Sequence, residues 1–255
     1  MGPLLFIVYI NDIPELDNLA HFILYADDAN IIVTASTIDE LFTKTNKLLE
    51  SLERWVDNNG LSINVKKSKY MIFSRTMDRL HMPKPLKYKN NNMEHVTEAR
   101  FLGVIVDDKL NWSHHIKTIV SKMSRYIGVL YRLKSSLPLE TRKLIYQSLI
   151  QSHLNFCSLV WGFAAKSNID KILTAQKKGM RAVIPGYSRY YYKNGSTPGH
   201  TKSSFNKFKI LSVQNVIAFN SLLFLEKVQN FPKLLPISIL KLISPDARPD
   251  KHINI

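Results

Sequence analysis

Two adjacent carboxylates, Asp27 and Asp28, are the residues of this sequence best suited to chemistry. They lie in the middle of residues 22–33, where apolar, β-branched or aromatic arms flank a short polar tip, which is the pattern of a β-hairpin. Carboxylates on a rigid turn suit hard cations such as Mg2+. Because neighbouring strand residues point to opposite faces, a metal site would need a further carboxylate from elsewhere. A plain acidic turn is the alternative.

The front half of the chain contains the elements that would position this tip. Thr37 and Glu40 form a capping box that begins a helix at about 38–58, and Gly60 supplies its left-handed stop. Its apolar face would cover one side of a sheet. Further strands are expected at 70–73 and 101–106, after an alternating stretch at 61–65.

The back half changes to helical spacing after Asn111. We expect helices at about 113–134, from Pro138 onward, at about 168–183 and over 205–230.

Charge is unevenly distributed along the 255 residues, whose net charge is +15. Residues 1–100 hold 12 Lys and Arg against 13 Asp and Glu, a net charge of −1, whereas residues 101–255 hold 23 against 7, a net charge of +16. A strongly basic back half indicates a polyanion partner, with nucleic acid favoured over a membrane. Surface lysines scattered for solubility are the alternative.

Several classes of protein are excluded by composition. Cys157 is the only cysteine, so there is no intramolecular disulfide and no Cys-rich zinc module, and a reducing compartment is expected. The apolar start has no basic residues ahead of it, so we expect no signal peptide, and no apolar run is long enough to span a bilayer. His114 and His115 lack nearby Cys or carboxylate partners, so we interpret His115 as core and His114 as surface.

The string Tyr25-Ala26-Asp27-Asp28 resembles the metal-binding turn of reverse transcriptases, specifically those of jockey-like non-LTR retrotransposons. Other blocks follow in that family's order: Gly2-Pro3-Leu4-Leu5-Phe6 with Tyr9-Ile10-Asn11-Asp12, then Trp55 with Asn59 to Asn64 and Lys67-Ser68, then Phe101-Leu102-Gly103-Val104 with Trp112 and His115-Ile116, then Tyr131-Arg132-Leu133, Leu144-Ile145-Tyr146 and Trp161-Gly162. The resemblance runs from Gly2 to about Arg181.

This resemblance implies RNA-directed DNA polymerisation by two-metal nucleotidyl transfer, with Mg2+, or Mn2+ in its place, as the cofactor. It implies that Asp27 is a direct metal ligand and that Asp28 beside it has a secondary role. Lys67 would act as a general acid at the leaving pyrophosphate, although three lysines within residues 66–69 are also typical of a solvated edge.

The same resemblance implies a set of nucleic-acid contacts. Tyr25 and Ala26 would lie against nucleic acid, and Phe101, Leu102 and Gly103 would hold the primer end, with core packing as a second role for Phe101 and Leu102. The partners would be an RNA template, a DNA primer and deoxynucleotides, and the location would be intracellular, in cytoplasm and nucleus, with no membrane.

The implied fold class is α+β: a truncated antiparallel polymerase palm packed with helices, followed by an α-helical thumb and a helical C-terminal extension. We expect the palm at 1–106, the thumb at 107–184, a flexible basic linker at 185–204 and the extension at 205–255.

The sequence departs from the family pattern because fingers and the first catalytic aspartate have no counterpart in it. The resemblance therefore predicts a fragment whose missing N-terminal polymerase half belongs to the intact element, and which is inactive alone. Two alternatives stay open: a non-catalytic nucleic-acid-binding remnant of a mobile element, and a fragment that never folds stably.

Overall fold

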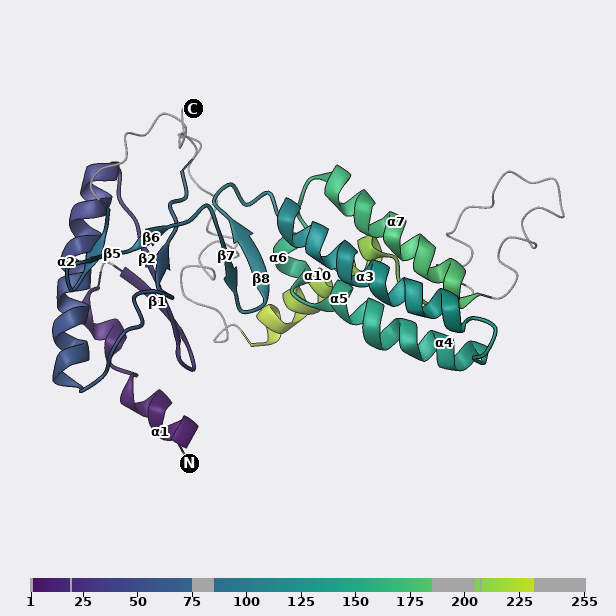
Figure 1. Cartoon of the computed structure of the whole chain (residues 1–255), viewed down its shortest axis with the longest axis horizontal. Helices are drawn as coiled ribbons and strands as arrows, with labels where there is room; N and C mark the ends of the chain where they lie inside the picture. Colours follow the sequence, from purple (N-terminus) through teal and green to yellow (C-terminus); the bar gives the residue numbers. More distant parts are fainter. Residues whose placement is uncertain (1, 19, 75–84, 185–204, 207, 232–255) are drawn as a thin grey trace. The chain divides into compact units, whose positions relative to one another are not determined.

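The computed structural model describes residues 2–18, 20–74, 85–184, 205–206 and 208–231 of the chain. It is a mixed α+β structure that divides into two compact units. Figure 1 shows the helices and strands coloured along the sequence. The first unit is Met1–Arg100 with Asp107–Lys109, and the second is Phe101–Val106 with Leu110–Ile255. The linker expected at 185–204 and most of the expected C-terminal extension lie outside the described residues.

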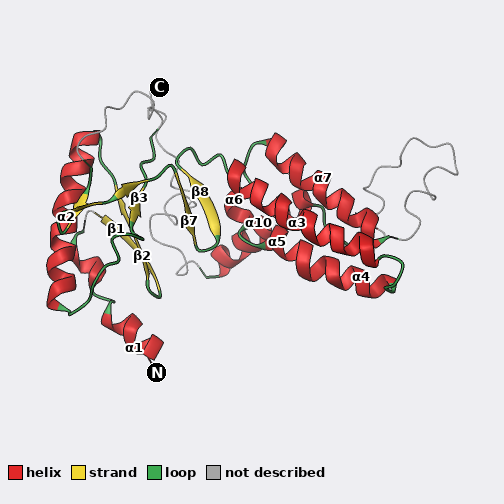
Figure 2. Ribbon diagram, in the orientation of Figure 1, coloured by secondary structure: helices red, strands yellow, loops and turns green. Residues whose placement is uncertain are grey.

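The first unit combines one long helix with short strands (Figure 2). Its helices are α1, Gly2–Tyr9, and α2, Ile38–Asn58, with a 3-10 turn at Ile13–Leu16. Its strands are β1, Ala20–Tyr25; β2, Asp28–Val33; β3, Lys69–Tyr70; β4, Lys87–Tyr88; β5, Asn91–Asn92; and β6, Glu94–His95. Strand β7, Glu98–Phe101, leads into the second unit.

The predicted hairpin is confirmed as the antiparallel pair of β1 and β2. Its register runs from Ala20 opposite Val33 to Tyr25 opposite Asp28, so only Ala26 and Asp27 form the turn. Ala26 has a φ of 51°, in the left-handed region that two-residue hairpin turns require because it matches the twist of the strands.

The capping signals predicted for α2 are also confirmed. The N–H of Glu40 donates to Thr37 Oγ1 at 3.2 Å, while the Glu40 carboxylate accepts from the N–H of Ser36 at 3.0 Å. The Lys44 ammonium, hydrogen-bonded to this carboxylate one turn later, lowers the pKa of Glu40. At the other end Gly60 has a φ of 63°, so the helix stops where the sequence predicts.

Two strand predictions need correction. The strand expected at 70–73 is reduced to β3, and the alternating stretch at 61–65 before it forms no strand. β3 pairs in parallel with β6, which departs from the all-antiparallel expectation; the chain between them is long enough for the crossover that a parallel pair needs. The single strand expected at 101–106 is instead a hairpin of β7 and β8, Val104–Asp107.

The turn between β7 and β8 explains this last difference. Leu102 has a φ of 44° and Gly103 a φ of 88°, and two successive left-handed residues reverse the chain between the strands. Because apolar residues continue on both sides of Gly103, hydrophobic periodicity alone does not predict this reversal.

The core of the first unit lies along the apolar stripe of α2. Buried side chains of α2 meet residues in or next to the 3-10 turn, β3 and β4; the cluster comprises Ile10, Ile13, Phe42, Leu49, Leu52, Val56, Ile72, Leu86 and Tyr88. The strand side chains Phe22, Leu24 and Ile31 pack against this cluster but remain partly exposed.

The second unit is helical (Figure 2). Its main helices are α3, Ser113–Leu133; α4, Leu139–Tyr146, continued by a π-helical turn at Gln147–Gln151 and by α5, Ser152–Asn155; α6, Ser158–Trp161; α7, Lys166–Val183; and α10, Val213–Asn230. The helices predicted at 113–134 and 168–183 are confirmed, and Pro138 is the N-cap of α4.

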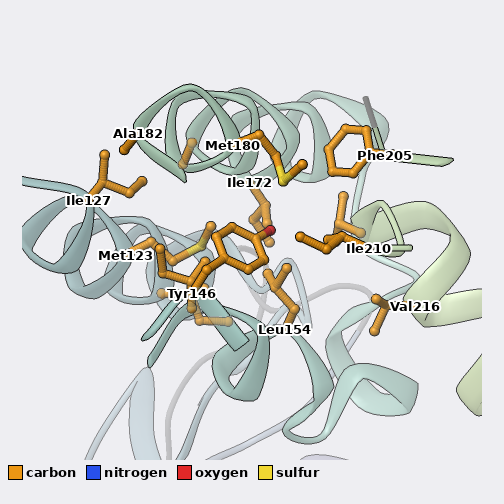
Figure 3. Packing of buried hydrophobic residues seen from close by; sticks show 14 of the residues in the cluster. Met123, Ile127, Tyr146, Leu154, Ile172, Met180, Ala182, Phe205, Ile210 and Val216 are labelled. Carbon is orange, nitrogen blue, oxygen red and sulfur yellow. The ribbon is translucent and has the colours of Figure 1, made fainter. Parts of the chain in front are cut away.

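Side chains from all these helices meet in one core (Figure 3). Tyr146, Ile172 and Trp161 are fully buried there, and burial raises the pKa of the Tyr146 hydroxyl. α10 starts later than the sequence predicts, at Val213, where the side chain of Ser212 caps it. Gln176 of α7, also fully buried, accepts from the N–H of Val213 and donates to the carbonyl of Leu211, both at 2.8 Å. Among the described helices, none is long and apolar enough to cross a membrane.

Candidate active site and nucleic-acid interface

The acidic tip of the β1–β2 hairpin is exposed. Asp27 lies in the turn and Asp28 is the first residue of β2, and both side chains face solvent together with Tyr25 and Ala26. Behind them Phe22 and Leu24 turn toward the core at alternate positions, which fixes the direction of the strands that carry the tip. The rigid turn that the sequence predicts is therefore present, with its carboxylates accessible.

The chemistry of this tip fits a hard divalent cation. Two neighbouring carboxylates offer only oxygen donors, which Mg2+ and Mn2+ accept. No group of three or more His, Cys, Asp or Glu side chains comes together anywhere in the described part of the chain. A cation at this tip would therefore need ligands beyond Asp27 and Asp28, such as water or a phosphate.

Lys67 lies in the turn that precedes β3. Its backbone N–H donates to the carbonyl and to the side-chain oxygen of Asn64, at 3.0 and 3.3 Å, and its ammonium is exposed. Its neighbour Lys69 pairs instead with Glu94 at 3.0 Å. No hydrogen bond or ion pair recorded among the described residues joins Lys67 to Asp27 or Asp28, so its catalytic role stays a prediction.

The residues expected to hold the primer form the β7–β8 turn. Phe101 is half-buried at the end of β7, and Leu102 is 39% exposed. A Cβ added to Gly103 would lie 3.3 Å from the ring of Phe156, so the turn sits against this side chain of the second unit.

These candidates fall in two different units. Asp27, Asp28 and Lys67 belong to the first unit, and Phe101, Leu102 and Gly103 belong to the second. Their convergence on one substrate stays a prediction of the sequence.

The basic half predicted from charge is concentrated on α3 and α7. These two helices carry nine basic side chains (Lys117, Lys122, Arg125, Arg132, Lys166, Lys171, Lys177, Lys178 and Arg181) and one acidic side chain, Asp170. An open groove of about 350 Å³ runs between the two helices, lined by Ser124, Thr174, Lys171, Lys178 and the acidic Asp170 among others. Hydroxyl and ammonium donors in one groove suit phosphate oxygens.

Some functional candidates could not be identified from the sequence. Asn168 is buried and donates to Ser113 Oγ at 2.9 Å, tying the start of α7 to the start of α3. His115 is buried, as predicted, but its Nδ1 also accepts from the N–H of Ile105 at 3.2 Å. For Asn168 the sequence does contain one signal. Asn168 lies on the same buried face of α7 as Ile172, and a polar residue at a position where apolar side chains are usual indicates a specific hydrogen bond.

Comparison with known families gives a match in the first part of the chain. Residues 1–106 match the family model described as reverse transcriptase (RNA-dependent DNA polymerase).

The relatives extend this match beyond residue 106. The chain is 27% identical over 205 residues to the RNA-directed DNA polymerase from mobile element jockey of Drosophila melanogaster, covering 74% of the chain and 22% of the relative. It is 25% identical over 210 residues to the probable RNA-directed DNA polymerase from transposon BS of the same species, covering 77% of the chain and 22% of the relative. The resemblance to jockey-like non-LTR retrotransposons is therefore confirmed, and the chain spans about a fifth of the length of these relatives. No solved structure matches the chain.

Proposed function

We propose that this chain carries the metal-binding and primer-holding parts of an RNA-directed DNA polymerase. The observation that carries the proposal is the exposed Asp27–Asp28 pair on a two-residue hairpin turn, inside the segment that matches the reverse transcriptase family. RNA-directed DNA polymerase is also the printed name of its relatives.

Asp27 is assigned as the direct metal ligand and Asp28 as its neighbour with a secondary role. When bound, Mg2+, or Mn2+ in its place, supplies positive charge to the oxygens of the phosphoryl group that is transferred. The hairpin's contribution is to hold the Asp27 carboxylate on a fixed turn, so that no reorganisation of the chain is needed when nucleotide arrives.

Lys67 is assigned as the proton donor to the leaving pyrophosphate. Its exposed ammonium projects from a turn whose backbone is fixed by Asn64, which leaves the side chain free to reach a phosphate. Positioned proton donors of this kind contribute about 10² to 10⁴-fold to rate.

The nucleic-acid partners are an RNA template and a DNA primer. Leu102 and Gly103 would hold the primer end, where Gly103 allows backbone to approach backbone, and Tyr25 and Ala26 would lie beside it. The nine basic side chains of α3 and α7 would track duplex phosphates. In polymerase terms residues 1–106 are assigned as the palm, 107–184 as the thumb, 185–204 as a linker and 205–255 as an extension; residues 101–106 of this palm belong to the second compact unit. We place this work in the cytoplasm and nucleus, where RNA templates and genomic DNA are found.

A second function, nucleic-acid binding without catalysis, is favoured by the ratio of nine basic side chains to one acidic side chain on α3 and α7. Such a protein would need neither Asp27 nor a divalent cation.

Primer extension separates these two functions. The chain is given an RNA template, a DNA primer, deoxynucleotides and Mg2+, and Asp27→Ala is compared with Asp39→Ala, an exposed carboxylate of the same unit. Incorporation that disappears in Asp27→Ala but persists in Asp39→Ala supports the polymerase. Duplex binding without incorporation by any variant favours the second function, and incorporation that survives Asp27→Ala contradicts the assignment of the metal ligand.

A further inference from the structure

The turn between β7 and β8 is fastened to the helices of its own unit at two points. On one side the N–H of Ile105, two residues after Gly103, donates to His115 Nδ1 at 3.2 Å. On the other side Gly103 lies against the ring of Phe156, close enough that an added Cβ would be 3.3 Å from two ring carbons.

A third residue joins the two points. The Trp161 indole N–H donates to the carbonyl of Phe156 at 2.9 Å, which fixes the backbone from which the Phe156 ring projects. The Trp161 ring also lies 6.3 Å from that of His115, at an interplanar angle of 53°. Trp161 is fully buried and His115 is 5% exposed, so both side chains are held by the packing of the core.

The start of α3 is itself restrained. Asn168 of α7 donates to Ser113 Oγ at 2.9 Å, and Lys171 donates to the Asn168 side-chain oxygen at 2.9 Å. The helix that carries His115 therefore begins at a fixed place relative to α7, and movement of the turn would have to break contacts with a packed body.

We propose that His115, together with Phe156 and Trp161, is a positioning residue that holds the Leu102–Gly103 turn in the geometry that receives the primer end. The inference rests on the proposed primer-holding role of this turn. His115 touches no substrate: its Nδ1 lone pair fixes the Ile105 amide, and the amide fixes the strand that follows the turn. A turn without this anchor would fluctuate, and the primer end would meet it in the right geometry less often.

The test uses the full chain with two substitutions of one side chain. His115→Phe keeps the ring and removes the acceptor, whereas His115→Asn retains an oxygen where Nδ1 stands. His114→Phe and His114→Asn are the matched controls, because His114 is the exposed neighbour on the same helix.

The first readout is hydrogen exchange at the amide of Ile105, which needs no nucleic acid. His115→Phe should raise this exchange about fivefold, since one hydrogen bond of typical net strength is lost, and His115→Asn should restore most of the protection. Unchanged exchange in His115→Phe overturns the proposal.

The second readout is the ratio of affinities for a duplex with a recessed primer end and a blunt duplex of the same length. A merely structural role would lower both affinities together, so the ratio would stay constant. A ratio that falls in His115→Phe and returns in His115→Asn supports the proposal, and raised exchange with a constant ratio overturns it. A wild-type chain without preference for the recessed end would contradict the primer-holding role itself, while the exchange at Ile105 would still decide whether His115 holds the turn.

Discussion

The two units of this chain differ in how they are held together. In the helical unit Ile172, Tyr146 and Trp161 are completely buried in a core shared by every helix. In the first unit the strands of the acidic hairpin keep Ile23 and Ile32 42% and 48% exposed, and α1 buries no side chain. The candidate metal ligands thus lie on a hairpin whose strands are partly exposed, whereas the candidate primer turn is anchored to a packed body.

This difference has a consequence for stability. Local signals such as caps and turns contribute about 1 kcal/mol each, whereas a buried aliphatic side chain contributes several times more. Substitutions should therefore lower the free energy of unfolding strongly in the core of the helical unit and weakly in the hairpin.

The largest effect is expected for Ile172→Ala. Removal of a fully buried side chain loses both transfer free energy and packing, so the free energy of unfolding of the helical unit should fall by about 3 kcal/mol. Chemical denaturation followed by tryptophan fluorescence measures it, with Trp112 and Trp161 in the helical unit and Trp55 in the first unit. Ile32→Ala, at a half-exposed position, should cost less than about 1 kcal/mol, and equal losses would contradict the contrast between the units.

A smaller effect is expected for Gly162→Ala. The new Cβ would lie 2.3 Å from the carbonyl oxygen of Ser158, so the end of α6 would have to distort, and 2.8 Å from Ile217, so α10 would have to move away; we expect a cost of about 2 kcal/mol. Gly128→Ala on α3 is the control, because nothing lies within 4 Å of its added Cβ. Helix propensity should make this control stabilising by up to about 1 kcal/mol, and destabilisation of similar size by both changes would argue against the close approach of α6 and α10.

Thr37→Ala should have a moderate effect in the first unit. It removes the hydroxyl that accepts from the N–H of Glu40, and loss of an N-cap costs about 1 kcal/mol. Thr43→Ala, which removes an exposed hydroxyl within the same helix, should stay within about 0.5 kcal/mol of the wild type. Thermal unfolding followed by helical circular dichroism compares them, and indistinguishable variants would mean that the cap does not hold α2.

The smallest effect is expected on nucleic-acid affinity. Lys171→Gln and Lys178→Gln, in the groove between α3 and α7, should each reduce the slope of log affinity against log salt by about one for a duplex. Lys44→Gln, on the first unit and paired with Glu40, should leave the slope unchanged. Equal slopes for all three variants would show that the duplex does not use this groove.

The elements best predicted from sequence are those specified by neighbouring residues. The β1–β2 hairpin, the two ends of α2 and the long helices α3 and α7 follow from alternation, caps and helical spacing that a few residues carry. Local specification of this kind is also why the accessibility of Asp27 and Asp28 could be anticipated.

The features that could not be predicted depend on partners far along the chain. The parallel pairing of β3 with β6 needs a crossover connection, and no local sequence pattern predicts it. The hydrogen bond from Ile105 to His115 and the bonds of Gln176 to Leu211 and Val213 join residues separated by at least ten positions. In the sequence, His115 and Gln176 simply occupy positions on the apolar face of a helix, so nothing indicates their partners. The reversal at Leu102 and Gly103 does not follow from hydrophobic spacing, because apolar residues continue on both sides of it; only the resemblance to the family implied a turn there.

The most direct test of the central claim is to titrate the full chain with Mn2+ and record amide signals by NMR. We expect paramagnetic broadening centred on residues 25–28 at concentrations that leave the helical unit unchanged, and we expect Asp27→Asn to remove it while Asp39→Asn does not. Broadening that persists in Asp27→Asn, or that is centred on a carboxylate of the helical unit such as Asp170, would contradict the account.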